Sequence, residues 1–510
     1  MKKTFSLLIF LSLSIFAFAQ YEDATKYAET ITKEDLRDYL SILASDAMEG
    51  RETGERGQKM AAAFIAFHFE SLGLKPVVKD GDTYSYYQKF ELERSSPGEI
   101  YLTINGKKLV NGEDLAYWGR KNMDKEQSID AVFLGSGSET AFSEVDVKGK
   151  AAIISASGSG YPQWRQLSGA AVNAGAAITL LIVADNDESF NTIITQFRRF
   201  GRSSLGFKQE SSESGGIFMI SQSIAARILD SSTDQLKKVA DDDAAGKKGS
   251  LKKIKAGKIN YLITRKSETV ITENVLGLIE GTDKKDEILV LSSHYDHIGR
   301  NGDEINNGAD DDGSGTTSIM EIAQAFAEAK KEGKGPRRSI LFICVTGEEK
   351  GLLGSQYYVE NPVFPLENTV ADLNIDMIGR FDSEHKDNQE FVYLVGSDRL
   401  STELHELSEK TNETFTGLSL DYTYNDEKHP DRIYYRSDHW NFAKNGIPII
   451  FYFTGIHEDY HKPTDTIDKI EFDLLQKRAS LVYYTAWVLA NRDERLVVDK
   501  LQETTLDGRN

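Results

Sequence analysis

The sequence predicts an α/β protein with a mostly parallel central sheet, helices on both faces of that sheet, and a smaller β-rich α/β domain inserted into it. After Asn274, apolar strand-like runs alternate with helical segments, as a parallel sheet requires. From about Ser96 to Lys258, short β-type runs stand between helical or Gly- and Ser-rich segments, and histidine is absent. The length of 510 residues leaves room for two or three domains.

Residues 1–19 have the features of a secretory signal peptide. Lys2 and Lys3 precede a short apolar core, and Ala17-Phe18-Ala19 fits the cleavage rule for small residues. We therefore expect cleavage before Gln20 and an exported mature chain, either periplasmic or secreted. No other stretch reaches ~18 consecutive apolar residues, so no membrane anchor is expected after cleavage.

The remaining chain is expected to form two domains. Residues 20–97 and 265–510 supply the main α/β domain, and residues 98–264 form the inserted one. Helical spacing of apolar residues predicts helices over 32–48 and 58–72. The lysine- and aspartate-rich run 237–258 is interpreted as a solvated connector. Strands of the insertion are expected at 99–104, 131–135, 150–156, 176–185 and 216–220.

The main domain has its clearest pattern in the C-terminal half. Continuous apolar runs of four to eight residues are typical of strands buried on both faces. Such a run occurs at 287–294, and further strands are expected at 338–346, 369–376, 390–396 and 447–453. Helices are expected over 313–331 and 472–491.

Composition excludes several classes of protein. Charged residues make up 27% of the chain and the net charge is −20, so a phosphate backbone would be repelled and nucleic acid is not an expected partner. Cys344 is the single cysteine, which rules out an intrachain disulfide and a zinc site built from thiolates. Any bound metal must therefore be held by histidine, aspartate and glutamate.

Acids and histidines collect where the predicted strands end. Active sites of open parallel sheets lie beyond the carboxyl ends of the strands. Burying so many carboxylates together would be costly unless cations neutralise them, and mixed imidazole and carboxylate ligation suits zinc. There are more such groups than one catalytic zinc needs, which favours two metal ions sharing a carboxylate. The groups are His294 and Asp296, Asp310-Asp311-Asp312, Glu348-Glu349, Asp376, and His457, Glu458, Asp459 and His461.

Five segments in order along the chain resemble the motifs of a known family. They read SSHYDHIG, NGADDDGSG, TGEEKGLLGS, NIDMIGR and YHKPTDT. These look like the motifs of the double-zinc exopeptidases, which include bacterial leucyl aminopeptidases and, more distantly, glutamate carboxypeptidase and the transferrin receptor. The resemblance covers about 30–75 and 270–490, and 98–264 looks like the protease-associated domain often inserted in this family.

The resemblance implies a role for each site residue. One zinc ion would be bound by Asp311, Glu349 and His461, and the other by His294, Asp311 and Asp376, so that Asp311 bridges two Zn²⁺. Glu348 would be the general base. Asp296 would orient the His294 imidazole. Tyr434, or its neighbour Tyr435, would help to hold the tetrahedral oxyanion.

The implied activity is hydrolysis of peptide substrates, with an aminopeptidase as the leading hypothesis. A carboxypeptidase or dipeptidase stays open because Arg380, Arg432 and Arg436 lie near the motifs. A glutaminyl cyclase, an inactive receptor-like binding protein and a dinuclear metal phosphatase are further alternatives. The complete ligand set and Glu348 argue against the first two of these. The sequence indicates neither the oligomeric state nor the preferred substrate side chain.

Overall fold

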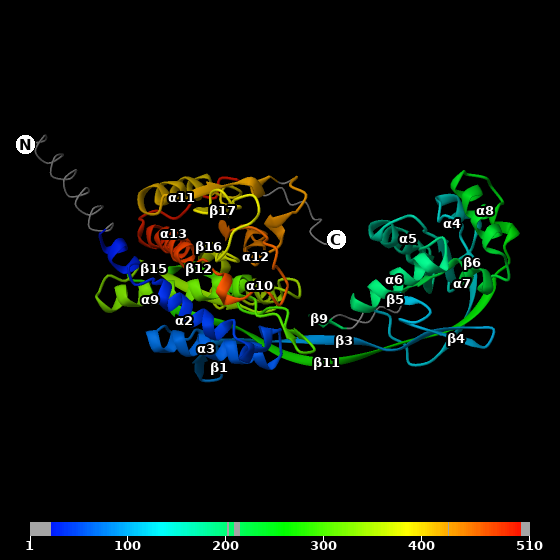
Figure 1. The fold of residues 1–510 in the computed structure, drawn as a ribbon, viewed down its shortest axis with the longest axis horizontal. Coiled ribbons are helices and arrows are strands. Elements are labelled where there is room, and N and C mark those ends of the chain that lie inside the picture. Colours follow the sequence, from blue (N-terminus) through cyan, green and yellow to red (C-terminus); the bar gives the residue numbers. More distant parts are fainter. Residues whose placement is uncertain (1–21, 201–202, 209–214, 427, 501–510) are drawn as a thin grey trace, which may run out of the picture. The chain divides into compact units, whose positions relative to one another are not determined.

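The computed structural model describes residues 22–200, 203–208, 215–426 and 428–500 (Figure 1). The expected signal peptide, residues 1–19, lies outside the described residues. Within the described part, no helix is both long and apolar enough to cross a membrane. The chain divides into two compact units. Unit 1 comprises the residues up to Glu91 and from Ile271 onward, and unit 2 comprises Leu92–Val270.

Unit 1 is built on a large, mostly parallel sheet. The strand order is β18-β17-β19-β16-β12-β15-β11. Pairing is parallel except between β17 and β19 and between β11 and β15. The strands are β11 (Gly257–Ile279), β12 (Lys284–His294), β15 (Arg338–Val345), β16 (Thr369–Ile375), β17 (Phe391–Val395), β18 (Ser419–Asp421) and β19 (Ile449–Phe453).

Helices cover both faces of this sheet, as successive side chains of one strand show. Leu289 and Leu291 pack in the cluster that includes the long helices of unit 1, whereas Ile288 and Val290 pack in a second cluster with α10 and α12. The predicted mixed α/β class with a helix-flanked sheet is therefore confirmed. The helices are α2 (Lys33–Leu43), α3 (Arg56–Leu72), α9 (Gly315–Lys331), α10 (Leu353–Glu360), α11 (Thr402–Phe415), α12 (His439–Ala443) and α13 (Phe472–Asn491).

The first helix ends earlier than its apolar pattern predicts. Thr32 caps α2 as expected, with its side chain accepting a hydrogen bond from the Asp35 N–H. The expected continuation to Met48 is wrong, because α2 ends at Leu43 and a 3₁₀ segment follows over Asp46–Arg51. Gly50 has φ +69°, and a side chain there would lie 2.4 Å from the Gly299 carbonyl oxygen. At the end of α2 itself, the Leu43 carbonyl oxygen accepts a hydrogen bond from the Arg51 guanidinium at 2.7 Å, which lies outside the helix.

Unit 2 has its own sheet and hydrophobic core. The order β6-β7-β8-β10-β5 is parallel except for the edge strand β5. The predicted connector 237–258 is wrong in its first part, because α8 buries Leu236, Val239 and Ala240 against this core. Its elements are β5 (Ala116–Trp118), β6 (Gln127–Phe133), β7 (Ala151–Ser155), β8 (Ile178–Ile182), β10 (Ile217–Ile220), α4 (Glu139–Glu144), α5 (Tyr161–Asn173), α6 (Asp187–Phe200), α7 (Gln222–Ile228) and α8 (Thr233–Ala244).

Two long strands carry the chain out of unit 1 and back. They are β3 (Tyr87–Ile104) and β11, which pair with each other. Residues 257–261 of β11 pair with β6, and residues 275–279 pair with β15. The remaining short strands are β1 (Val78–Asp80), β2 (Thr83–Ser85), β4 (Lys107–Val110), β9 (Ser204–Gly206), β13 (Arg300–Asn301) and β14 (Glu304–Ile305).

Candidate metal centre

The carboxyl edge of the unit 1 sheet brings the expected acids and histidines together. His294 ends β12, and Asp376 follows β16 directly. Glu348 and Glu349 follow β15, and His461 lies on the long connection after β19. Asp311 comes from the turn that precedes α9. Because β12, β15, β16 and β19 run parallel, these side chains converge from segments far apart in the sequence.

Two groups of donor atoms share Asp311. In the first group, His294 Nε2 lies 3.3 Å from Asp311 Oδ1 and 3.6 Å from Asp376 Oδ1. In the second group, His461 Nε2 lies 3.2 Å from Asp311 Oδ2 and 3.1 Å from Glu349 Oε2. The two oxygens of one carboxylate therefore face different sets of donors.

The donors fit zinc in both spacing and chemistry. Ligand bonds of about 2.0–2.2 Å at a tetrahedral angle place donor atoms ~3.3 Å apart, close to the separations in both groups. Buried polar atoms almost always have partners, yet His294 Nε2, Asp311 Oδ2 and Glu349 Oε1 have no hydrogen-bond partner. Electron-rich atoms that converge without hydrogen bonds are what a shared cation would satisfy.

The acids on either side of Asp311 have other partners. Asp312 accepts hydrogen bonds from the N–H groups of Gly315 (2.8 Å) and Met377 (3.1 Å). Asp310 accepts from the Gly379 N–H at 2.7 Å and lies 3.3 Å from His457 Nε2. Of these three consecutive acids, Asp311 is the one that faces both groups of donors.

Asp296 supports the site through its backbone as well as its side chain. His294 Nδ1 donates to the Asp296 carbonyl oxygen at 3.1 Å, which leaves Nε2 unprotonated and free to bind a metal ion. The Asp296 carboxylate is more distant from Nδ1, at 3.8 Å. It accepts instead from the Thr53 hydroxyl at 2.7 Å and from the Glu348 N–H at 3.3 Å. Asp296 thereby links His294 to the segment that carries Glu348.

The predicted base lies at the floor of a cleft. Glu348 lines this cleft together with Asp311 and Asp376. Burial raises the pKa of Glu348 well above its usual range; His294 opposes the rise and Glu349 reinforces it. The walls are largely apolar or aromatic, with one arginine. They comprise Met377, Ile433, Arg436, Phe451, Phe453, Ile456 and Tyr460.

Tyr434 is not among the residues that line this cleft. Its ring lies under the Arg399 guanidinium and edge-on to Trp440. The tyrosine beside the acids is Tyr460, whose ring stacks on the His461 imidazole with centroids 3.9 Å apart. The pKa of Tyr460 is raised by burial first and then by Asp311 and Glu349, so its hydroxyl keeps its proton at neutral pH. Tyr460 was missed although it directly precedes an expected ligand.

A third histidine, His297, also reaches the site. Its side chain is fully buried, and Nδ1 lies 2.9 Å from Glu349 Oε1 and 3.7 Å from Asp311 Oδ2. The sequence reasoning assigned it no role. The available signal was its place in the motif His294-Tyr295-Asp296-His297, at the carboxyl end of a buried strand.

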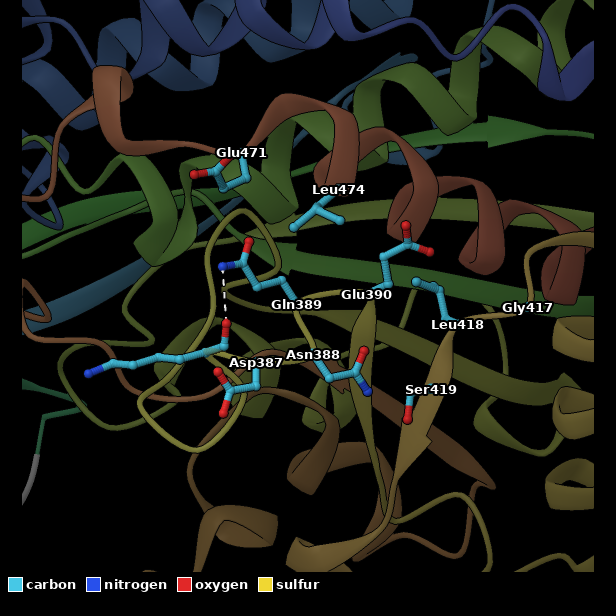
Figure 2. Close-up of a pocket in the computed structure, with 10 residues that line it drawn as sticks. Asp387, Asn388, Gln389, Glu390, Gly417, Leu418, Ser419, Glu471 and Leu474 are labelled. Atoms are coloured by element: carbon cyan, nitrogen blue, oxygen red, sulfur yellow. Dashed lines mark hydrogen bonds between the residues drawn. The ribbon is translucent and has the colours of Figure 1, made fainter.

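An open depression elsewhere on unit 1 is separate from the cleft (Figure 2). It is lined by polar side chains from the loop before β17, by residues 417–419, and by Glu471 and Leu474. Gln389 Nε2 donates to the Lys386 carbonyl oxygen at 3.4 Å within it. None of the site residues described above lines this depression.

Known proteins are similar to the part of the chain that holds this site. The model for peptidase family M28 matches residues 274–486. A probable leucine aminopeptidase of Arthroderma otae is 33% identical over 215 residues, which cover 41% of this chain and 55% of that protein. An aminopeptidase of Bacillus subtilis is 27% identical over 232 residues, which cover 44% of this chain and 46% of that protein. The chain thus spans about half the length of these curated relatives.

Solved structures share the fold. An aminopeptidase from Aneurinibacillus sp. strain AM-1 has a TM-score of 0.58 at 19% identity, covering 94% of this chain and 98% of that one. A zinc aminopeptidase from Bacillus subtilis has a TM-score of 0.50 at 19% identity, covering 91% and 96%. The resemblance inferred from the five motifs is confirmed. Residues 274–486, which contain all five expected ligands, match the model of peptidase family M28.

Proposed function

We propose that this protein is an exported aminopeptidase that removes N-terminal residues from peptides at a site with two zinc ions. The observation that carries the proposal is the pair of donor groups that share Asp311 beside the partly buried Glu348. His294, Asp311 and Asp376 would hold one zinc ion, and Asp311, Glu349 and His461 the other. The names of the relatives, including leucine aminopeptidases, support the substrate class.

In the proposed reaction, Glu348 transfers a proton and Tyr460 donates a hydrogen bond. Bound zinc supplies a water of lowered pKa and polarises the scissile carbonyl. Glu348, which lines the cleft, accepts the proton of the attacking water and delivers it to the leaving amine. Tyr460, which lines the cleft and keeps its hydroxyl proton, would donate a hydrogen bond to the oxyanion.

The residues that line the cleft favour peptide substrates with an apolar N-terminal residue. Phe451, Phe453 and Ile456 offer an apolar wall to a substrate side chain, and the floor carboxylates favour a free α-amine over a carboxylate. Arg436 also lines the cleft and favours a carboxypeptidase or dipeptidase, since it would attract a free carboxylate.

The test compares aminoacyl-nitroanilides with N-blocked peptides, using wild type, Glu348→Ala and the surface control Glu360→Ala. We expect hydrolysis of the unblocked substrates alone. Glu348→Ala should lower kcat by roughly 10²–10⁴-fold because the general base is lost, with zinc content unchanged. Glu360→Ala should match wild type, since Glu360 is exposed on α10. Release of C-terminal residues from blocked peptides would establish the carboxypeptidase alternative instead.

The oxyanion donor is tested with a matched pair of tyrosines. Tyr460→Phe should lower kcat by about 10²-fold or more, because one preorganised donor is removed. Tyr434→Phe should leave kcat near the wild-type value, because Tyr434 does not line the cleft. If Tyr434→Phe lowered kcat and Tyr460→Phe did not, Tyr434 would be the oxyanion donor, as the family resemblance implies.

Two further parts of the proposal concern the rest of the chain. We take unit 2 to be a protease-associated domain, which its compact, separate core supports. We take residues 1–19 to be a cleaved signal peptide, so N-terminal sequencing of exported protein should begin at Gln20. A mature protein that begins at Met1 would remove the export assignment.

A further inference from the structure

Both ring nitrogens of His297 are buried, and neither has a hydrogen-bond partner. Nδ1 is directed at the second group of donors, 2.9 Å from Glu349 Oε1 and 3.7 Å from Asp311 Oδ2. A buried imidazole that faces two carboxylates is a costly arrangement unless something satisfies its nitrogen.

A hydrogen bond from Nδ1 to Glu349 is the first alternative. It would make His297 an orienting group for the carboxylate, as histidines and acids around metal ligands often are. The separation of 2.9 Å is short enough, but neither Nδ1 nor Glu349 Oε1 is aligned for a hydrogen bond. Nδ1 and Glu349 Oε1 are therefore better explained as two donors directed at one cation than as a donor and its acceptor.

The surrounding backbone holds the ring in this position. The His297 N–H donates to the Arg51 carbonyl oxygen at 3.2 Å. Gly308 lies against the ring so closely that a Cβ there would be 2.6 Å from its carbon atoms. The His461 ring lies edge-on at a centroid distance of 5.7 Å. His297 thus approaches the carboxylates in a fixed orientation, as a metal ligand must.

We propose that His297 binds zinc through Nδ1 as a fourth protein ligand, together with Asp311, Glu349 and His461. This inference rests on the proposed pair of zinc ions and goes beyond the five ligands that the family motifs imply. It makes the two positions unequal. The position with His297 has four protein donors, whereas the position of His294, Asp311 and Asp376 has three. Four protein ligands are typical of closed zinc sites and three of sites that keep an open coordination position.

The first test counts histidine ligands directly. Zinc-edge X-ray absorption of the fully loaded wild-type protein should show three imidazole rings distributed over two zinc ions. Two rings would contradict the proposal while leaving the dinuclear centre intact. This measurement needs no variant, so it stands even where substitution of a buried residue impairs folding.

The second test separates a ligand from an orienting group through zinc affinity. Asn at position 297 keeps an N–H near the place of Nδ1 but has no imidazole lone pair. If His297 is a ligand, His297→Asn and His297→Ala should both weaken binding of one zinc ion by more than about 10-fold, since removing even supporting groups costs that much. If His297→Asn bound both ions as wild type does, His297 would be only an orienting group.

A matched control is His68→Asn, which replaces another buried histidine. His68 Nε2 lies 3.2 Å from the carbonyl oxygen of Met320 in α9, and none of the ion pairs of the site's acids involves His68. His68→Asn should bind both zinc ions with wild-type affinity. The outcomes also separate this inference from the proposed function: a wild-type protein that bound no zinc would remove both, whereas two ions with two imidazoles would remove the His297 ligand alone.

Discussion

Arg51 shows how one side chain can position several parts of the site. Its guanidinium is buried and donates to the carbonyl oxygens of Leu43, Tyr295, Asn307 and Gly308, at 2.6–2.9 Å. It therefore joins the end of α2 to the segment of His294 and His297 and to the turn that carries Asp311. No short sequence motif indicates this role, because the partners of Arg51 are backbone carbonyl groups, which every residue has.

Replacing Arg51 with methionine should be strongly destabilising. Methionine fills much of the same space but leaves buried carbonyl oxygens without donors, at about 1–3 kcal/mol each. We expect the free energy of unfolding to fall by roughly 3 kcal/mol or more, measured by chemical denaturation. Arg56→Met is the control: its side chain is 74% exposed, so the change should stay within about 0.5 kcal/mol. Equal effects of the two substitutions would show that the buried contacts of Arg51 contribute nothing.

Gly308 is a second residue at the site, and the packing around it requires glycine. Its φ is +55°, and a Cβ would lie 2.2 Å from the Asp311 carbonyl oxygen and 2.6 Å from the His297 ring. Gly308→Ala should therefore displace the turn of Asp311 and reduce the zinc content of the purified protein, measured by elemental analysis. Gly302→Ala, also at positive φ but in open space, controls for backbone strain alone. Full zinc loading of Gly308→Ala would contradict the tight packing around His297.

At the scale of elements, α9 buries a carboxyl group away from the site. Glu321 accepts one hydrogen bond, from the Thr32 N–H at 3.2 Å, and its Oε1 has no partner. Burial raises the pKa of Glu321 to about 8, against a weaker lowering by the Thr32 N–H. Because the folded protein holds this proton more tightly than the unfolded chain, stability from Glu321 is complete at low pH and is lost as pH rises toward about 8.

Glu321→Gln should therefore gain stability relative to wild type as the pH rises. Glutamine keeps the acceptor for Thr32 and cannot ionise. The difference in unfolding free energy should grow between about pH 5 and pH 8 by on the order of 4 kcal/mol. Denaturation at a series of pH values, at one fixed zinc concentration, measures it. Glu328→Gln, at a partly exposed position of the same helix, should show no such growth. A pH-independent difference for Glu321→Gln would mean that Glu321 is ionised in the folded protein.

The sequence was most informative where elements are long and buried. Continuous apolar runs predicted β12, β15, β16 and β19, and the rule that sites lie beyond strand ends drew attention to His294, Glu349 and Asp376. It was less informative where tertiary contacts override local pattern. The last carbonyl oxygen of α2, that of Leu43, accepts a hydrogen bond from the buried Arg51, and the charged run of α8 includes a narrow apolar stripe. Only the folded chain brings Tyr460 and His297 to the site.

At the scale of the whole molecule, the two units have separate hydrophobic cores. The cluster of unit 2 shares no residue with those of unit 1 in the part of the chain that the structure describes. All the proposed zinc ligands belong to unit 1. A ligand that binds the folded state raises the stability of the unit to which it binds.

Calorimetry should therefore show two unfolding transitions, of which chelation lowers one. Removal of zinc should lower the unfolding temperature of unit 1 and leave that of unit 2 unchanged. The variant Asp311→Asn, which removes the shared carboxylate charge, should unfold at a lower temperature than the wild type and respond less to chelator. A single transition, or an equal shift of both, would mean that the units unfold together.

The zinc content of the purified protein tests the paired metal centre most directly. After loading with zinc and removal of the excess, elemental analysis of the wild type should find two zinc ions per chain, and Asp311→Asn should retain fewer than two because its carboxylate belongs to both groups of donors. A wild-type protein that retained no zinc, or an Asp311→Asn variant that retained two, would contradict a site organised around Asp311.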